Sequence, residues 1–283
     1  MPDGPGQGSD TPLLNLVGHG AGPPVVLVHG VAGSHMVWSD LSPLLEPHFT
    51  VVAVDLLGYG HSPKPKTTYT PALHVEALRR TLAARGFAPP HDLIGLSMGA
   101  NLVLEYARRW PDEVRELIGI GFPYYPDEAE ARRALQHNAW IRLTLRHPAI
   151  AGVVTPATWA IGRHTAGLFR NASTLYSPPV AADALRASYG AFKSSLFNCM
   201  VYFRQDEALE AGATMRRLFI HGDDDQWAGP EAIEKPLARY PNTRVEVIEG
   251  PHNLVVAQPD ETARLIIGHL SGSTPPPGAE TAP

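Results

Sequence analysis

A single serine stands between two glycines in the segment HDLIGLSMGANLVLEYARRWPDEV, residues 91–114. The apolar run before Gly95 predicts a buried strand, and apolar residues spaced four apart after Gly99 predict a helix. Glycine at both positions would relieve the crowding of a tight strand-to-helix turn, so that the Ser97 hydroxyl points away from the sheet. The turn would also place the Met98 N–H beside Ser97, at the positive end of the helix. The pattern is typical of a serine nucleophile, although an ordinary turn with a small polar residue also fits it.

A serine nucleophile needs a base to take its proton and an acid to orient that base. Of the 13 histidines, His252 is the candidate base, because it follows the apolar run that ends at Ile248 and stands directly behind a Gly-Pro pair. Three consecutive acids, residues 223–225, follow the apolar run 218–221. The order serine, acid, histidine distinguishes one of the unrelated scaffolds that use such a triad. The order alone leaves open which of the three acids would act.

These residues need a sheet to bring them together. Six short apolar or β-branched runs predict its strands: Pro24–His29, Thr50–Asp55, Asp92–Gly95, Leu117–Gly121, Leu218–His221 and Arg244–Ile248. Their apolar character is continuous rather than alternating, which indicates burial on both faces. With helical patterns between them, the runs predict an α/β fold, a mostly parallel central sheet flanked by helices. Such sheets bind their ligands at the carboxyl ends of the strands.

A long segment without a convincing strand separates Gly121 from Leu218. A structureless loop of that length is rare in a compact domain, and the segment contains several helical patterns. We expect these helices to form a cap above Ser97, although they could instead simply extend the core. The ends of the chain are rich in Pro, Gly and Ser, which is typical of disordered tails. The expected division is a core in residues 11–122 and 213–271, a helical cap or lid in residues 123–212, and tails in residues 1–10 and 272–283.

The composition of the 283 residues is that of an ordinary globular protein, with 44% hydrophobic and 18% charged residues. A net charge of −5 indicates no basic surface for nucleic acid or for an anionic membrane. We recognise neither a secretory signal nor an apolar run of membrane-spanning length. The single cysteine, Cys199, excludes an intrachain disulfide and fits a reducing compartment. We therefore expect a cytoplasmic protein that acts on a small-molecule substrate.

Five blocks of sequence occur in the order VVLVHGVAGSHMVW, VVAVDLLGYGHSPKP, IGLSMGANLVLEYA, LFIHGDDDQWAGPEA and GPHNLVVAQPDETARLI. Together they resemble the α/β-hydrolase fold family, in the group with a serine nucleophile and a helical cap. The blocks frame residues 25–267, whereas the expected cap is similar only in its position and helical character. The resemblance implies an α/β-hydrolase fold and an enzyme of the serine hydrolase type.

The resemblance assigns roles to individual residues. Family members place the acid three residues after the glycine that ends the strand, which here is Gly222, so the acid would be Asp225. Asp224 is the alternative. The His-Gly pair after the first central strand leads into the oxyanion loop in this family, so the N–H groups of Val31 and Met98 would bind an oxyanion.

Other polar residues near these motifs have structural interpretations. His29 is expected to be structural, and Asp55 to fix the loop that follows its strand. Three consecutive acids lack the alternating spacing of a calcium loop, so no metal is expected there. The segment GHGAG, residues 18–22, is not followed by the Gly-Lys-Ser/Thr of a phosphate-binding loop or by a complete dinucleotide motif. It predicts a turn between edge strands, and no cofactor is expected.

The expected reaction is attack of Ser97 on the carbonyl of an ester, lactone, thioester or related acyl compound, with His252 as base and Asp225 as its orienting acid. The same motifs occur in biosynthetic enzymes of this scaffold that eliminate or cyclise acyl groups, cleave C–C bonds or oxidise without a cofactor. They also fit a ligand receptor that has lost its catalysis. Dehalogenases and epoxide hydrolases with an aspartate nucleophile are disfavoured, because position 97 is serine.

The size of the substrate follows from the aromatic residues of the expected cap, although ordinary packing would also account for each of them. They favour a medium-sized, largely apolar molecule. These residues are Trp140, Trp159, Tyr176 and Phe192.

Overall fold

The computed structural model describes residues 11–165, 178–212, 214–227 and 229–272. The tails expected in residues 1–10 and 272–283 lie outside these ranges, except for Gly272, and so does Tyr176 of the expected cap. No helix in the described ranges combines the length and the apolar character that a membrane span requires.

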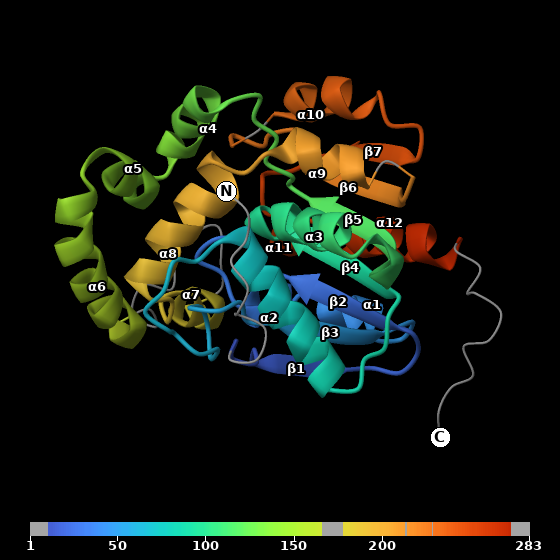
Figure 1. Ribbon diagram of the computed structural model, residues 1–283, viewed down its shortest axis with the longest axis horizontal. Coiled ribbons are helices and arrows are strands. Elements are labelled where there is room, and N and C mark those ends of the chain that lie inside the picture. The colour runs from blue at the N-terminus through green and yellow to red at the C-terminus, as the bar shows by residue number, and fades with distance from the viewer. Residues whose placement is uncertain (1–10, 166–177, 213, 228, 273–283) are drawn as a thin grey trace.

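A seven-stranded sheet forms the centre of the molecule, in the order β1-β3-β2-β4-β5-β6-β7 (Figure 1). β1 runs antiparallel to β3, and every other neighbouring pair is parallel. The α/β fold with a mostly parallel sheet is therefore confirmed. The strands are β1 (Leu16–His19), β2 (Pro24–Val28), β3 (Thr50–Val54), β4 (His91–Leu96), β5 (Val114–Ile120), β6 (Arg216–Gly222) and β7 (Thr243–Ile248).

All six predicted runs are strands, and their ends differ from the prediction by three residues or fewer. β5 begins earlier than expected because its charged residues find partners inside the sheet, where Arg115 forms an ion pair with Asp92 on β4. The turn prediction for residues 18–22 was wrong in part. Gly18 and His19 belong to β1, and β2 is not an edge strand, because β3 pairs between β1 and β2.

Helices cover both faces of the sheet, and each face has its own buried core. Alternate residues of β2 point to opposite cores, with Val26 and Val28 in one and Val25 and Leu27 in the other. This double burial explains the continuous apolar character of the strand sequences. One face carries α2 (Pro71–Ala84), α3 (Met98–Arg109) and α10 (Pro230–Leu237), and the other carries α1 (Ser42–Leu45), α11 (Leu254–Ala257) and α12 (Pro259–Ser271).

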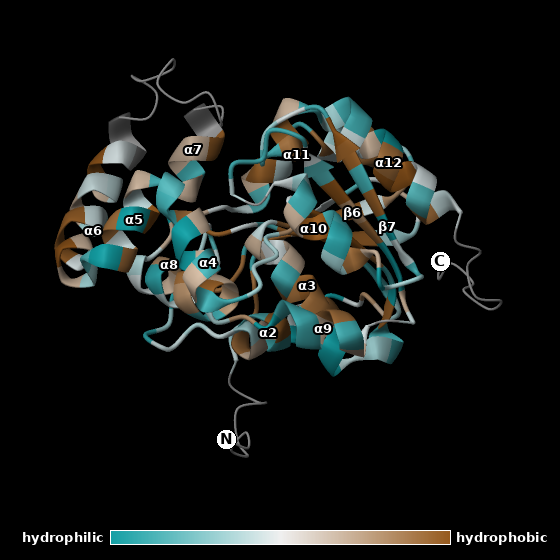
Figure 2. Ribbon diagram, turned by 90° about the horizontal axis from the view of Figure 1, so that it is seen from above, coloured by the Kyte–Doolittle hydropathy of each residue, from teal (hydrophilic) through white to brown (hydrophobic). Residues whose placement is uncertain are grey.

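The segment between β5 and β6 is helical. Figures 1 and 2 show α4 to α8 grouped at one end of the molecule, the end toward which the parallel strands point. The last helix, α9, packs against α3 of the core. These elements are α4 (Glu128–Ala134), α5 (Ala139–Arg146), α6 (Pro148–Thr165), α7 (Pro178–Ala184), α8 (Tyr189–Ser195), the π-helical turn η5 (Leu196–Val201) and α9 (Gln205–Ala211).

Hydrogen bonds tie this helical segment to the loops of the core. The Ser188 N–H donates to the Gly58 carbonyl at 2.9 Å, and the Tyr69 N–H donates to Ser194 Oγ at 2.8 Å. Both core residues follow β3, so α8 lies against the loop at the carboxyl end of that strand. The division at residues 123 and 212, and the role of the segment as a cap, remain predictions.

Candidate active site

Ser97 occupies the turn between β4 and α3 in a conformation that side chains rarely adopt, with φ 55° and ψ −120°. The flanking glycines make this turn possible. A Cβ on Gly95 would lie 2.3 Å from the Gly99 carbonyl carbon, and a Cβ on Gly99 would lie 2.1 Å from the Val28 oxygen. Both distances are far below contact, so only glycine allows the strand and the helix to approach this closely. Strained backbone conformations of this kind are common at functional sites.

The predicted triad residues meet in space, although they are far apart in the chain. Ser97 follows β4, Asp225 follows β6 and His252 follows β7. His252 Nε2 lies 2.9 Å from Ser97 Oγ, and His252 Nδ1 lies 2.7 Å from Asp225 Oδ2. An ionised carboxylate only accepts hydrogen bonds, so Nδ1 carries the proton and Nε2 has a free lone pair directed at the hydroxyl. This arrangement can remove the Ser97 proton.

Asp225 is held by three donors at the base of the site. His221 Nε2 lies 3.1 Å from Asp225 Oδ2, the same oxygen that faces His252, and the Trp227 N–H donates to Oδ1 at 2.8 Å. The side chains of His221 and Asp225 are fully buried. Burial by itself would raise the pKa of Asp225, but the hydrogen bonds from His221 and His252 outweigh it and hold that pKa below the usual range. The carboxyl group is therefore ionised near neutral pH.

Sequence reasoning missed two residues of this site, His221 and Trp227. The Trp227 ring stacks on the His252 ring, with centroids 5.2 Å apart and an interplanar angle of 14°, which fixes the plane of the imidazole. The sequence pattern marks His221 only as the last residue of a predicted strand. The available signal was its position immediately before the glycine from which the acid was counted, four residues from Asp225.

The backbone around Val31 and Met98 forms a second part of the site. Gly30 packs directly against the serine, since a Cβ on Gly30 would lie 3.1 Å from Ser97 Cβ and 3.7 Å from Oγ. Val31 follows Gly30 in a turn closed by the Gly33 N–H and the Gly30 carbonyl at 3.1 Å. Met98 is the first residue of α3, so its N–H has no acceptor within the helix. Val31 therefore follows a residue that packs on Ser97, and Met98 follows Ser97 directly in the chain, while the oxyanion role of their N–H groups remains a prediction.

The other two acids of the run 223–225 lie away from His252. Asp223 and Asp224 are exposed. Asp223 Oδ1 accepts the Gly250 N–H at 2.9 Å, and the Asp224 N–H donates to the Gly250 carbonyl at 3.0 Å. They fix the loop that carries Asp225, and Asp225 is the acid of the three that contacts the histidine.

His29 and Asp55 have the structural contacts that were expected for them. His29 is fully buried, and its Nε2 accepts the Leu56 N–H at 3.0 Å. Asp55 accepts the backbone N–H groups of His35 at 2.7 Å and His61 at 2.8 Å. None of these hydrogen bonds of His29 or Asp55 involves Ser97.

The described aromatic residues expected in the cap do not all line one surface. Trp159 and Phe192 are buried and pack edge to face, with ring centroids 5.3 Å apart, whereas Trp140 is 38% exposed. Among the described residues, one group of side chains could hold a metal ion, and it consists of His35, His61 and Asp183. It is separate from the triad.

The family model of the alpha/beta hydrolase fold matches residues 23–257. The chain belongs to this family. The match covers all of the parallel strands and the Ser97–His252–Asp225 group. The expected family membership is confirmed.

Named relatives of the chain are hydrolases. It is 39% identical over 120 residues to 2-(acetamidomethylene)succinate hydrolase from Mesorhizobium japonicum, across 41% of this chain and 42% of that protein. It is 36% identical over 105 residues to 2-hydroxy-6-oxo-6-(2'-aminophenyl)hexa-2,4-dienoic acid hydrolase from Metapseudomonas resinovorans, across 36% of each. Alignments to the curated relatives span between 23% and 42% of those proteins.

Solved structures extend the likeness to nearly the whole chain. The structure of E-2-(acetamidomethylene)succinate hydrolase matches with a TM-score of 0.66 at 26% identity, over 91% of this chain and 95% of that one. An esterase from Thermogutta terrifontis matches with a TM-score of 0.67 at 21% identity, over 92% and 93%. At that identity the esterase shows the shared fold alone.

Proposed function

We propose that this protein is a serine hydrolase that cleaves an acyl bond of a small molecule through Ser97, His252 and Asp225. The observation that carries the proposal is the unbroken hydrogen-bond chain from Asp225 Oδ2 through both nitrogens of His252 to Ser97 Oγ, with steps of 2.7 and 2.9 Å. Each residue has the chemical type and the proton position that its role requires.

In the proposed reaction His252 Nε2 takes the proton of Ser97 as Oγ attacks the substrate carbonyl. Asp225 stabilises the imidazolium that forms, and remains ionised throughout. The N–H groups of Val31 and Met98 stabilise the negative oxygen of the tetrahedral intermediate, and the positive end of α3 adds to their effect. His252 then protonates the leaving group, and a water molecule that it activates releases the acid from Ser97.

The substrate class is proposed from the site and from the relatives together. The names of the two relatives described above refer to a succinate and a dienoic acid, which are small organic acids. The compound in the second name contains no ester, thioester or amide bond, so its hydrolysis breaks a C–C bond, and C–C bond cleavage is the runner-up reaction on the same residues. We propose an ester, lactone, thioester or amide of a medium-sized, largely apolar acid, because the interior of the proposed cap is apolar, as the packing of Trp159 on Phe192 illustrates.

Product analysis with purified protein tests the proposal and separates the two reactions. Aryl esters, lactones, thioesters, enamides and vinylogous β-diketones are incubated with the wild type and with Ser97→Ala, and product masses are recorded. Acyl hydrolysis gives an acid together with an alcohol, thiol or amine, and their summed mass is that of the substrate plus one water. A lactone gives a single hydroxy acid with the same added mass. Two carbon fragments from a diketone would instead favour the runner-up. Equal rates for wild type and Ser97→Ala on every compound would reject the serine mechanism.

A further inference from the structure

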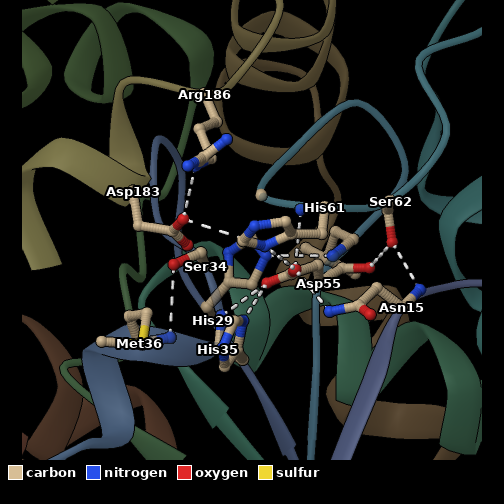
Figure 3. Close-up of polar contacts among 12 residues, drawn as sticks. Asn15, His29, Ser34, His35, Met36, Asp55, His61, Ser62, Asp183 and Arg186 are labelled. Carbon is tan, nitrogen blue, oxygen red and sulfur yellow. Dashed lines mark hydrogen bonds and ion pairs between the residues drawn. The ribbon is translucent and has the colours of Figure 1, made fainter. Parts of the chain in front are cut away.

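Three side chains from distant parts of the chain converge beside the loop that precedes η1 (His35–Trp38) (Figure 3). His35 follows β2, His61 follows β3, and Asp183 belongs to α7 of the helical segment. One ligating atom from each of the three lies within 4.8 Å of the other two. The proposed reaction uses none of these side chains.

Asp183 has an oxygen that the described residues leave without a partner. Its side chain is 10% exposed, and Arg186 Nε donates to Oδ1 at 2.8 Å. The second oxygen, Oδ2, is buried and has no hydrogen-bond partner within the described residues. A buried carboxylate oxygen without a partner is costly, so this oxygen is available to a bound ligand.

His61 lies between two carboxylates but is too far away to bond either. Its Nδ1 is 3.6 Å from Asp55 Oδ2 and 3.8 Å from Asp183 Oδ1, beyond the range of a good hydrogen bond. The side chain is 50% exposed, so an ion could reach it from solvent. This spacing leaves room between imidazole and carboxylate for a bridging ion.

His35 is oriented by the buried carboxylate of Asp55. Oδ1 of Asp55 accepts both the backbone N–H of His35 at 2.7 Å and its Nδ1 at 2.9 Å. When Nδ1–H bonds to the carboxylate, the lone pair of the neutral ring is on Nε2. A metal-bound histidine usually donates the N–H of its other ring nitrogen to a carboxylate, a backbone carbonyl or water. The contact of His35 with Asp55 is of this kind.

We propose that His35, His61 and Asp183 form a binding site for a divalent transition-metal ion of the Zn²⁺ type, which fixes α7 to the loops after β2 and β3. Two imidazoles and one carboxylate suit Zn²⁺ and not Ca²⁺ or Mg²⁺, which bind through oxygen. Tetrahedral bonds of about 2.1 Å place ligand atoms about 3.4 Å apart. The 3.8 Å between His61 Nδ1 and Asp183 Oδ1 is close to this value. The two negative charges of Asp55 and Asp183 exceed the single positive charge of Arg186, which favours binding of a cation.

Calorimetric titration of the metal-free, tag-free full chain with ZnCl₂ tests the site. We expect one saturable site in the wild type, and an affinity at least about tenfold lower in His61→Ala, since the loss of even an outer partner costs that much. The His61 side chain is half exposed, so the variant should fold. The matched control is His48→Ala, which removes an exposed histidine between α1 and β3 and should leave the affinity unchanged.

Thermal unfolding with and without Zn²⁺ provides a second measurement, because an ion that binds only the folded chain raises its Tm. The rise should occur in the wild type and in His48→Ala, and should be lost in His61→Ala and Asp183→Asn. The proposal is overturned if the wild type shows no one-to-one binding, or if His61→Ala binds Zn²⁺ as tightly as His48→Ala. Both measurements are independent of catalytic activity.

Discussion

Replacement of Asp225 by asparagine should disable the proposed triad while preserving the fold. Three groups among the described residues donate to the carboxylate: the Trp227 N–H to Oδ1, and the ring nitrogens of His221 and His252 to Oδ2. An amide offers one oxygen and one NH₂ group. If its oxygen accepts from Trp227, its NH₂ faces both histidines, and His252 must move its proton to Nε2. Nε2 then cannot accept the proton of Ser97.

The size of the loss follows from this wrong tautomer. The opposite amide orientation places NH₂ against the Trp227 N–H, so it does not rescue the site. For a serine triad with intact geometry and the wrong tautomer, kcat falls about 10⁴-fold, which corresponds to about 5.4 kcal/mol of transition-state stabilisation. We expect a loss of this order for Asp225→Asn, with KM changed little.

The assay is steady-state turnover of the best ester or related compound, together with thermal unfolding to confirm that each variant folds. Asp224→Asn is the matched control, because that side chain is exposed one residue away. It should retain wild-type turnover. If Asp225→Asn keeps turnover within about tenfold of wild type, or if Asp224→Asn is the impaired variant, the role given to Asp225 is wrong.

Three further predictions test neighbouring parts of the structure. His221→Leu removes a donor to the ionised Asp225 and should lower kcat about 10- to 100-fold. His221→Gln, which keeps a donor, should recover part of kcat, and equal losses in both variants would contradict the role. Gly99→Ala places a Cβ 2.1 Å from the Val28 oxygen and should lower the free energy of unfolding by about 3 kcal/mol, measured in urea. A cost below about 1 kcal/mol would show that the turn can widen. The hydrogen bond to Asp55 raises the pKa of His35, so the protonated pair stabilises the fold at low pH and this contribution is lost as pH rises through the folded-state pKa. With EDTA present, the Tm difference between wild type and His35→Gln should therefore be larger at pH 6 than at pH 9, and a constant difference would contradict it.

The strands and the triad could be predicted because each depends on a local pattern. Strands buried on both faces have continuous apolar runs, as in β2 and β4. Ser97 follows such a run in β4, whereas His252 follows β7, which is only partly buried and was predicted from its β-branched residues. Parallel strands bring their carboxyl ends to one edge of the sheet. The contact between His252 and Asp225 then depends on only one loop after each strand.

The features that were missed depend on contacts between distant residues. β1 has four residues, is half exposed and contains Gly18, so it lacks the apolar run of the other strands. The position of His221 beside Asp225 depends on the path of the loop after β6. Asp183 reaches His61 only because α7 docks on the core, and no local motif specifies that docking.

Labelling with a fluorophosphonate is the most direct test of the central claim that Ser97 is an activated nucleophile. The reagent phosphonylates an activated serine at neutral pH, and peptide mass spectrometry identifies the modified residue. We predict one adduct on Ser97 in the wild type and in Ser39→Ala, a control that removes an exposed serine. Ser97→Ala should show no adduct and a turnover about 10⁶-fold lower. An adduct on another residue, or full turnover by Ser97→Ala, would contradict the account.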